Sequence, residues 1–368
     1  METSKTLRII IAGGGTGGHI FPAIAIAGAL KLQSPGIELL FVGASGKMEM
    51  EKVPQAGYRI EGIDIAGLNR SSLIKNIFLP IKLIRSFFQV SRILRAFRPD
   101  AVVGVGGYSS FPVLRAAQAK GIPTFIHESN SFAGKSNRLL GKKATAIFVA
   151  SDGMEKFFPA GKIRITGNPV RSNITGKPPS RQDAIRFFGL DPARPTILST
   201  GGSLGAKGIN EAIAAGLDKF GKNGIQLIWQ TGKPFAEQAA SFSRGNPNIW
   251  TGDFITQMEF AFAAADVVIS RSGAMSIAEL CVARKPVVFV PFPFAAEDHQ
   301  TVNAMNLVAK SAGLMVKDSE AKEKLVDTTI SLLRDEGLRI RLIENIGHLS
   351  VSDADTVIAG EILRTIIK

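Results

Sequence analysis

A histidine directly after a run of glycines is the first feature of this sequence that could do acid–base chemistry. His19 closes residues 13–19, GGGTGGH, which follow an apolar run and should lead into a helix. The positive end of a helix dipole disfavours an imidazolium, so a neutral ring able to accept a proton is expected. From the residues alone, a histidine that caps or packs the helix is an equal alternative.

The same glycines formally match the G-x-G-x-x-G pattern of dinucleotide-binding sites. That pattern also requires an acidic residue at the end of the second strand, where it binds the ribose. Residues 39–42, the apolar run expected to form that strand, lead instead into Gly43, Ala44 and Ser45. A nicotinamide-dependent dehydrogenase is therefore disfavoured.

A second set of polar residues follows similar turns in the C-terminal half. Residues 201–206, GGSLGA, offer backbone amides and the Ser203 hydroxyl, and residues 270–279, SRSGAMSIAE, form a turn and the start of a helix. Amides at a helix N-terminus suit a diphosphate, and Glu279 suits two vicinal ribose hydroxyls. Gln300 and Asn303 are uncharged side chains of the kind that bind sugar hydroxyls. A solvated Glu279 is the alternative.

Two similar α/β halves are needed to position these residues. Apolar runs expected to be strands alternate with helical patterns, at 7–12, 38–42, 101–105, 124–127 and 146–149, then at 196–200, 226–230, 249–251, 267–269 and 287–290. This alternation predicts parallel sheets with helices on both faces, and such sheets bind ligands at the carboxyl ends of their strands. Turn formers at 167–169 and 177–180 mark the expected junction, and the length of 368 residues suits two domains.

The positive charge is concentrated in the N-terminal half. Residues 1–170 hold 22 Lys and Arg against 10 Asp and Glu, whereas residues 171–368 hold 22 against 21. This asymmetry predicts a polyanionic partner for the N-terminal half, either nucleic acid or an anionic membrane surface.

Residues 65–99 favour the membrane, because they contain no acidic residue and seven basic ones among many apolar side chains. On a helix, Lys82, Arg85, Arg92 and Arg95 form one polar stripe beside an apolar face that includes Phe87, which is typical of an interfacial helix. The alternative is an amphipathic helix packed on its own sheet, and both roles can combine.

No metal site or disulfide is expected. Cys281 is the single cysteine, and the four histidines have no metal-ligand spacing with it. Asp353 and Asp355 imitate a metal-binding D-x-D motif but stand at the start of the last helix. With no secretory signal visible in the sequence given, the cytoplasm is the expected compartment.

Seven segments together resemble the MurG family of glycosyltransferases in identity, order and spacing. They are GGTGGH at 14–19, GVGGYSSFP at 104–112, HESN at 127–130, TGNPVR at 166–171, GGSLGA at 201–206, SRSGAMSIAE at 270–279 and PFPFAAEDHQTVNA at 291–304. Two positions depart from the family pattern: Ser129 replaces the Gln of HEQN, and Met275 stands where many members have Leu.

The resemblance implies an enzyme that moves N-acetylglucosamine from UDP-GlcNAc to undecaprenyl-diphospho-muramoyl-pentapeptide, turning lipid I into lipid II for peptidoglycan synthesis. It also implies the α/β GT-B fold, with two Rossmann-like domains whose parallel sheets face each other across a cleft. The reaction would invert the anomeric configuration and need no metal or other cofactor. Another GT-B UDP-sugar transferase acting on a membrane lipid is the alternative, and a polyanion-binding protein without catalysis is the rival from another class.

The resemblance also assigns roles to residues. His19 would be the base for the muramoyl 4-hydroxyl, with Glu128 able to contribute. The UDP-GlcNAc site would comprise Ile255 at the uracil, Glu279 at the ribose, Ser203, Ala274 and Met275 at the diphosphate with Ser276, Ile277 and Ala278 beside them, Gln300 and Asn303 at the sugar, and Thr16, Gly17, Gly18, Asn130 and Arg171 closing the site. The acceptor diphosphate would lie against Gly14, Gly15, Gly106, Gly107 and Tyr108.

The expected domains follow from these roles. Residues 1–168 would bind the acceptor and an anionic membrane surface, and residues 169–345 would bind the UDP-sugar. Residues 346–368 would form a C-terminal helix that packs back on the N-terminal domain. The protein would lie peripherally on the cytoplasmic face of the membrane, with lipid I and UDP-GlcNAc as partners and no nucleic acid.

Overall fold

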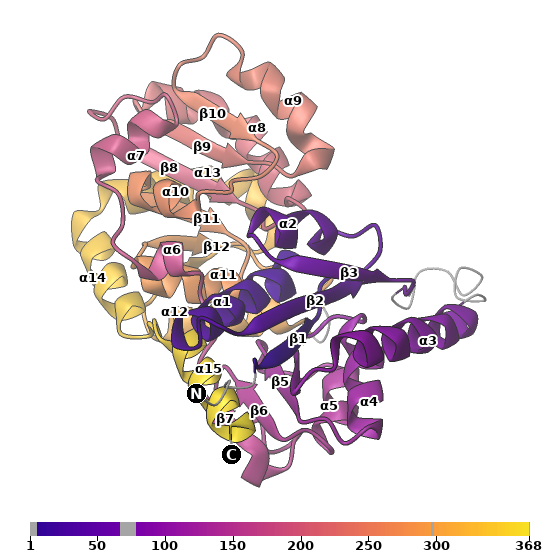
Figure 1. Ribbon diagram of the computed structural model, residues 1–368. Helices are drawn as coiled ribbons and strands as arrows, with labels where there is room; N and C mark the ends of the chain where they lie inside the picture. The colour runs from indigo at the N-terminus through magenta and orange to yellow at the C-terminus, as the bar shows by residue number, and fades with distance from the viewer. Residues whose placement is uncertain (1–5, 67–78, 296–297, 368) are drawn as a thin grey trace. The chain divides into compact units, whose positions relative to one another are not determined.

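The computed structural model describes residues 6–66, 79–295 and 298–367, which form two compact units (Figure 1). The first unit contains residues 1–171 together with 353–368, and the second contains residues 172–352. The chain therefore leaves the first unit after Arg171 and returns to it at Asp353.

The first unit is built on a parallel sheet of seven strands in the order β3-β2-β1-β4-β5-β6-β7. The strands are β1 (Arg8–Ala12), β2 (Glu38–Ala44), β3 (Arg59–Ile63), β4 (Ala101–Gly104), β5 (Thr124–Glu128), β6 (Ala146–Val149) and β7 (Ile163–Ile165). Its helices are α1 (Gly17–Gln33), α2 (Glu49–Gln55), α3 (Leu79–Phe97), α4 (Ser110–Ala119), α5 (Lys135–Gly141), the short 3-10 helix η2 (Ala160–Lys162) and α15 (Ala354–Ile366).

The second unit repeats this plan with a parallel sheet of six strands in the order β10-β9-β8-β11-β12-β13. The strands are β8 (Thr196–Thr200), β9 (Gln226–Gln230), β10 (Ile249–Gly252), β11 (Val267–Ser270), β12 (Val287–Phe289) and β13 (Leu314–Met315). Its helices are α6 (Ser172–Thr175), α7 (Arg181–Phe187), α8 (Lys207–Lys222), α9 (Lys233–Ser243), α10 (Met258–Ala264), α11 (Ala274–Ala283), α12 (His299–Ala309), η4 (Asp318–Glu320), α13 (Ala321–Arg334) and α14 (Glu336–Gly347).

Central strands are apolar on both faces because helices cover both faces. Ile9, Ile10 and Ile11 of β1 are all fully buried, with Ile9 and Ile11 in one core and Ile10 in the core on the other side of the sheet. Continuous apolar runs of this kind are what parallel sheets require.

In each sheet the strand order reverses beside the first strand of the unit. β1 lies between β2 and β4, and β8 lies between β9 and β11. Ligands of such sheets bind beyond the carboxyl ends of the strands at this reversal. The glycine turns after β1 and β4, and the turns after β8 and β11, lie at these two points.

The ten strands expected from the sequence are confirmed to within two residues, and the two-sheet α/β architecture with them. Three strands were not expected: β3, β7 and β13. β3 and β7 alternate apolar with charged or small residues at the two edges of the first sheet, and β13 has only two residues at an edge of the second. Such strands are defined by their pairing rather than by an apolar run.

Helix α3 packs on the core with one side and exposes apolar and basic side chains on the other. Val90, Ile93 and Leu94 are buried in the core beneath the sheet, while Ile84 and Phe88 keep 59% and 74% of their surface exposed. Arg85, Arg92 and Arg95 are exposed on the same outer side. Phe87, expected on the interfacial face, is half-buried against the core instead.

Residues 67–78, which include Arg70 and Lys75 of the basic stretch, lie outside the described residues. Within the described ranges, no helix has both the length and the apolar character needed to cross a bilayer.

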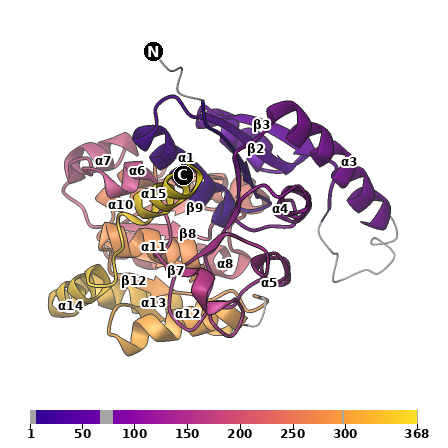
Figure 2. The same cartoon turned by 60° about the horizontal axis from the view of Figure 1, so that its bottom comes forward.

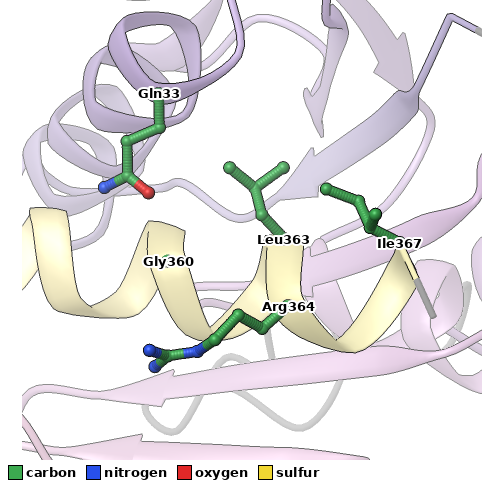
Figure 3. Close-up of a pocket in the computed structure, with 5 residues that line it drawn as sticks. All are labelled: Gln33, Gly360, Leu363, Arg364 and Ile367. Atoms are coloured by element: carbon green, nitrogen blue, oxygen red, sulfur yellow. The ribbon is translucent and has the colours of Figure 1, made fainter. Parts of the chain in front are cut away.

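Helix α15 packs on the first unit beside α1, as Figures 1 and 2 show. Ile358 and Ile362 are fully buried in the core that contains β1, and the Gln33 side-chain amide donates to the Thr356 carbonyl at 2.8 Å. A surface pocket lies between the C-terminal end of α1 and α15 (Figure 3), lined by Gln33, Gly360, Leu363, Arg364 and Ile367. It lies at the end of α1 opposite to His19, about 20 Å along the helix.

We predict that Ile362→Ala destabilises the first unit by about 2–5 kcal/mol, because it leaves a cavity in a core that cannot fully collapse. Val357→Ala, on the same helix but 43% exposed, is the matched control. Denaturant unfolding followed by circular dichroism measures both variants. Equal stability of the two variants would show that α15 contributes little to the core.

Candidate functional site

His19 lies in the first turn of α1, half-buried, with its ring fixed by the preceding glycine turn. Its Nδ1 lies 3.1 Å from the Gly14 carbonyl oxygen and 3.4 Å from the Thr16 hydroxyl. A carbonyl oxygen only accepts, so Nδ1 carries the proton and donates to it. In the neutral ring, Nε2 is therefore the nitrogen with the free lone pair, as a general base requires.

Burial lowers the pKa of His19 from its ordinary value, and the nearby carboxylates of Glu128 and Glu49 oppose this shift. The ring is consequently neutral at physiological pH. The neighbouring His127 is fully buried, and burial lowers its pKa to about 4, so it adds no competing positive charge.

The turn after β4 approaches the Nε2 edge of the ring. A Cβ at Gly106 would lie 2.7 Å from His19 Cδ2 and 2.8 Å from Nε2, and Gly106 has a φ of +97°. Only glycine fits this position. Gly107 lies against the backbone of Gly14, and the Tyr108 ring lies beside Gly15.

Glu128 ends β5 and is 5% exposed. Its Oε1 accepts from the backbone and side-chain amides of Asn130 at 3.1 and 3.3 Å, and its Oε2 accepts from the Gly134 amide at 3.1 Å and the Asn137 side chain at 2.9 Å. Donors to both oxygens stabilise the carboxylate and occupy its lone pairs. Of the two candidate bases, His19 keeps a lone pair on Nε2, whereas both oxygens of Glu128 already accept hydrogen bonds. Asn137 is a buried partner of Glu128 that the sequence did not reveal.

A second buried carboxylate, Glu49, was also missed. It is 1% exposed, and its two oxygens accept from the Gly15 amide at 2.8 Å and the Ala44 amide at 2.9 Å. The surrounding sequence, KMEME, is typical of a solvated helix start, so no sequence signal pointed to it.

The donor-site residues expected in the first unit surround the start of α1. Thr16 precedes the helix, Gly17 and Gly18 begin it, and the Arg171 guanidinium lies 4.2 Å from the centre of the Phe21 ring. Arg171 is thus held beside the turn that carries His19 by a cation–π contact.

In the second unit, the turn after β11 brings α11 and α12 together. The Ser272 hydroxyl donates to the Gln300 carbonyl at 2.8 Å, and the Asn303 side chain donates to the Ser272 carbonyl at 3.1 Å. The Gln300 side-chain oxygen accepts from the Phe292 amide at 3.0 Å. Ala274, Met275 and Ser276 form the first turn of α11, whose amides have no acceptor within the helix.

The other expected donor residues lie around the same sheet edge. Ser203 is in the turn between β8 and α8, and Ile277, Ala278 and Glu279 continue α11, with Glu279 half-buried. Ile255 follows β10, two strands from β8, and its side chain is 3% exposed. Because this side chain is buried, the expected contact between Ile255 and uracil would have to come from the Ile255 backbone.

Arg271 is a further residue whose role the sequence did not reveal. It is 7% exposed, and its guanidinium donates to the carbonyls of Val290 and Pro291 at 2.9 Å and to Asp318 at 2.5 Å. Burial lowers the pKa of Arg271, and the Asp318 carboxylate opposes this. Arg271 thereby ties the turn after β11 to the segment after β12.

Across the described residues, His, Cys, Asp and Glu side chains do not gather in any group of three or more that could hold a metal ion.

Comparison with known proteins gives a consistent result. Residues 9–149 match the glycosyltransferase family 28 N-terminal domain, and residues 196–350 match its C-terminal domain. The chain is 51% identical over 362 residues to a Bacteroides fragilis protein named UDP-N-acetylglucosamine–N-acetylmuramyl-(pentapeptide) pyrophosphoryl-undecaprenol N-acetylglucosamine transferase, covering 97% of this chain and 95% of the relative. A Bacteroides thetaiotaomicron protein of the same name is 52% identical, covering 98% of both chains.

Among solved structures, the crystal structure of Acinetobacter baumannii MurG aligns with a TM-score of 0.72 at 28% identity, covering 98% of this chain and all of the other. The likeness confirms the GT-B architecture of two parallel-sheet α/β domains. The chain therefore belongs to glycosyltransferase family 28, and within it to the MurG family.

Proposed function

We propose that this protein transfers N-acetylglucosamine from UDP-GlcNAc to the 4-hydroxyl of the muramoyl residue of lipid I, giving lipid II. The observation that carries the proposal is the identity of about half of all residues, over nearly the whole chain, with transferases named for this reaction. The first unit would bind the acceptor and the second the UDP-sugar.

The acceptor hydroxyl is activated by His19. Its Nε2 lone pair takes the hydroxyl proton as the oxygen forms a bond to the anomeric carbon of the donor sugar, and the bond from that carbon to UDP breaks on the opposite face. The configuration is thereby inverted. Glu128 stabilises the imidazolium that forms, because its carboxylate lies near the ring and raises its proton affinity.

The leaving UDP gains negative charge as the glycosidic bond breaks. That charge is stabilised by the amides at the start of α11 and by the Arg171 guanidinium. Gln300 and Asn303 hold the sugar, and Glu279 accepts hydrogen bonds from the ribose. The hydrogen bonds of Ser272 with Gln300 and Asn303 support this assignment, because they hold the proposed sugar-binding residues beside the start of α11.

The acceptor is a membrane lipid, and α3 provides a surface suited to its membrane. Exposed Ile84 and Phe88 share their side of the helix with exposed arginines, which is the composition of an interfacial helix. We place the protein peripherally on the cytoplasmic face, where a soluble UDP-sugar and a membrane acceptor are both within reach.

A transfer assay with UDP-GlcNAc and a short-chain lipid I analogue tests the reaction and its base together. His19→Ala should lower turnover by roughly a hundredfold or more, as expected for lost acid–base catalysis, while UDP affinity stays close to parental. Because the folded-state pKa of His19 lies below its ordinary value of 6.5, the acid limb of the kcat/KM profile should also fall below that pH.

The product of this assay distinguishes the proposed reaction from that of another GT-B UDP-sugar transferase. Another sugar, or another lipid acceptor used in preference, would identify a different GT-B transferase. Near-parental turnover in His19→Ala would remove His19 from the role of base.

UDP binding should depend on Glu279. UDP-GlcNAc should raise the melting temperature, because a ligand that binds only the native state stabilises it. Glu279→Ala should weaken the binding free energy of UDP by about 1–3 kcal/mol, the usual cost of losing charge-assisted hydrogen bonds. A thermal unfolding scan measures the first effect and isothermal titration calorimetry the second, with Glu237→Ala on α9 as the control. Equal UDP affinity of Glu279→Ala and the parent would remove Glu279 from the ribose site.

Binding to anionic liposomes should depend on the outer side of α3. Each basic residue near an anionic surface contributes about 1 kcal/mol, so Lys82→Glu combined with Arg85→Glu should weaken binding strongly. Phe88→Ser should weaken the part of the binding that survives high salt. Leu32→Ser, 81% exposed on α1 of the same unit, is the matched control in liposome sedimentation. A parental protein that ignores anionic liposomes at low salt would contradict the interfacial role.

A further inference from the structure

The buried carboxylate of Glu49 and the ring of His19 hold opposite ends of one peptide group. Glu49 Oε2 accepts from the N–H of Gly15 at 2.8 Å, and His19 Nδ1 donates to the C=O of Gly14 at 3.1 Å. These two backbone groups belong to the same peptide bond. Because that bond is planar, fixing the direction of its N–H also fixes the direction of its C=O.

The turn is shaped around this carboxylate. A Cβ at Gly14 would lie 2.3 Å from the carboxyl carbon of Glu49, and a Cβ at Gly43 would lie 2.5 Å from its Cγ. The second oxygen, Oε1, is held by the Ala44 amide at 2.9 Å, so the side chain is fixed at both oxygens. At 1% exposure, Glu49 has no water to replace these partners.

This arrangement changes what the glycine turn can bind. In dinucleotide-binding folds the amides of this turn receive the pyrophosphate of the cofactor. Here the Gly15 amide is already bound to a carboxylate of the chain itself. The Gly15 amide therefore stabilises the turn itself, and the anion that it binds is the Glu49 carboxylate.

The peptide group also carries an electronic effect. A carboxylate that accepts from the N–H polarises the peptide and makes its carbonyl a stronger acceptor, since hydrogen bonds in series strengthen one another. The Gly14 carbonyl then holds the proton of His19 on Nδ1 more firmly. Carboxylate, peptide and imidazole form a series in which each group orients the next.

We propose that Glu49 is a positioning residue for the base: acting through the Gly14–Gly15 peptide, it fixes the tautomer and orientation of His19 and supports the positive charge that His19 gains in the reaction. The proposal rests on the proposed function for the identity of the base. Glu49 does not touch the substrates in this role.

Several titratable groups interact electrostatically with the His19 ring. They are Glu128 and His127 on β5 and Glu49 on α2. Tyr108, after β4, interacts with Glu49. Burial lowers the pKa of His19, and the two carboxylates oppose the shift. Removing the Glu49 charge should therefore lower the His19 pKa further.

The test compares Glu49→Gln with Glu51→Gln in the full-length protein. Glu51 lies on the same helix with its side chain 56% exposed, so it controls for loss of one negative charge nearby. The protein has four histidines, and NMR titration of labelled histidine, with His19→Gln to assign the resonance, gives the pKa of His19 without any substrate. Transfer kinetics with UDP-GlcNAc and a lipid I analogue are measured on the same variants.

Glu49→Gln should lower the pKa of His19, move the acid limb of kcat/KM to lower pH, and reduce kcat by roughly tenfold or more, as misplacement of a catalytic group does. The KM for UDP-GlcNAc should stay parental. A merely structural role would change stability or kcat without moving the His19 pKa or the acid limb. A His19 pKa equal in Glu49→Gln and Glu51→Gln would overturn the proposal.

If Glu49→Gln does not fold, Glu49→Asp carries the test. It keeps the charge but draws the carboxylate back from the Gly15 amide, so the Gly14 carbonyl becomes a weaker acceptor. The pKa of His19 and the acid limb should then still move to lower pH, by less than in Glu49→Gln, while kcat falls. A parental His19 pKa in Glu49→Asp would overturn the proposal. Failure of the proposed function looks different: the parental protein itself would not transfer N-acetylglucosamine, whereas the effect of Glu49 on the His19 pKa would remain measurable.

Discussion

In the mechanism that we propose, the chemistry of the first unit depends on the hydrogen bond from His19 Nδ1 to the Gly14 carbonyl. It leaves Nε2 as the basic nitrogen, and it requires the carbonyl to point at the ring. Gly14 has no room for a side chain because Glu49 lies beneath it, and Gly106 has none because the imidazole lies against it. The two glycine-rich motifs, far apart in the sequence, thus serve a single histidine.

The second unit meets a related requirement with different residues. Its loops must hold uncharged side chains such as Gln300 beside the start of α11. The buried side chain of Arg271 orders these loops. Arg271 binds two carbonyls of the segment after β12 and the Asp318 carboxylate, which fixes the path of the chain toward Gln300. A buried cation with all its partners present orients the backbone, whereas loss of one partner would leave a charge uncompensated.

Much of this was predictable from the sequence, for identifiable reasons. Central strands such as 196–200 and 226–230 are fully buried segments with apolar residues at their centres, and their bounds were predicted to the residue. The strand-to-helix turns before α1 and α11 were predicted because glycines beside polar residues mark such turns. Edge strands such as β7, by contrast, are partly exposed and carry no apolar run.

What escaped prediction depends on contacts between distant segments. Glu49 is recognised only when the Gly15 amide, 34 residues away, is seen to lie on its carboxylate. Asn137 and Asp318 likewise act through partners on other elements. The periodicity of α3 predicted an amphipathic helix, but it did not separate half-buried Phe87 from exposed Phe88, because neighbouring residues differ by only 100° around a helix.

The tautomer of His19 tests the account most directly. The ¹⁵N chemical shifts of its ring, measured in the ligand-free protein at neutral pH, report which nitrogen carries the proton. The account predicts a neutral ring protonated on Nδ1, with Nε2 unprotonated. A ring protonated on Nε2 would contradict it, because the nitrogen offered to the acceptor hydroxyl would then be unable to take its proton.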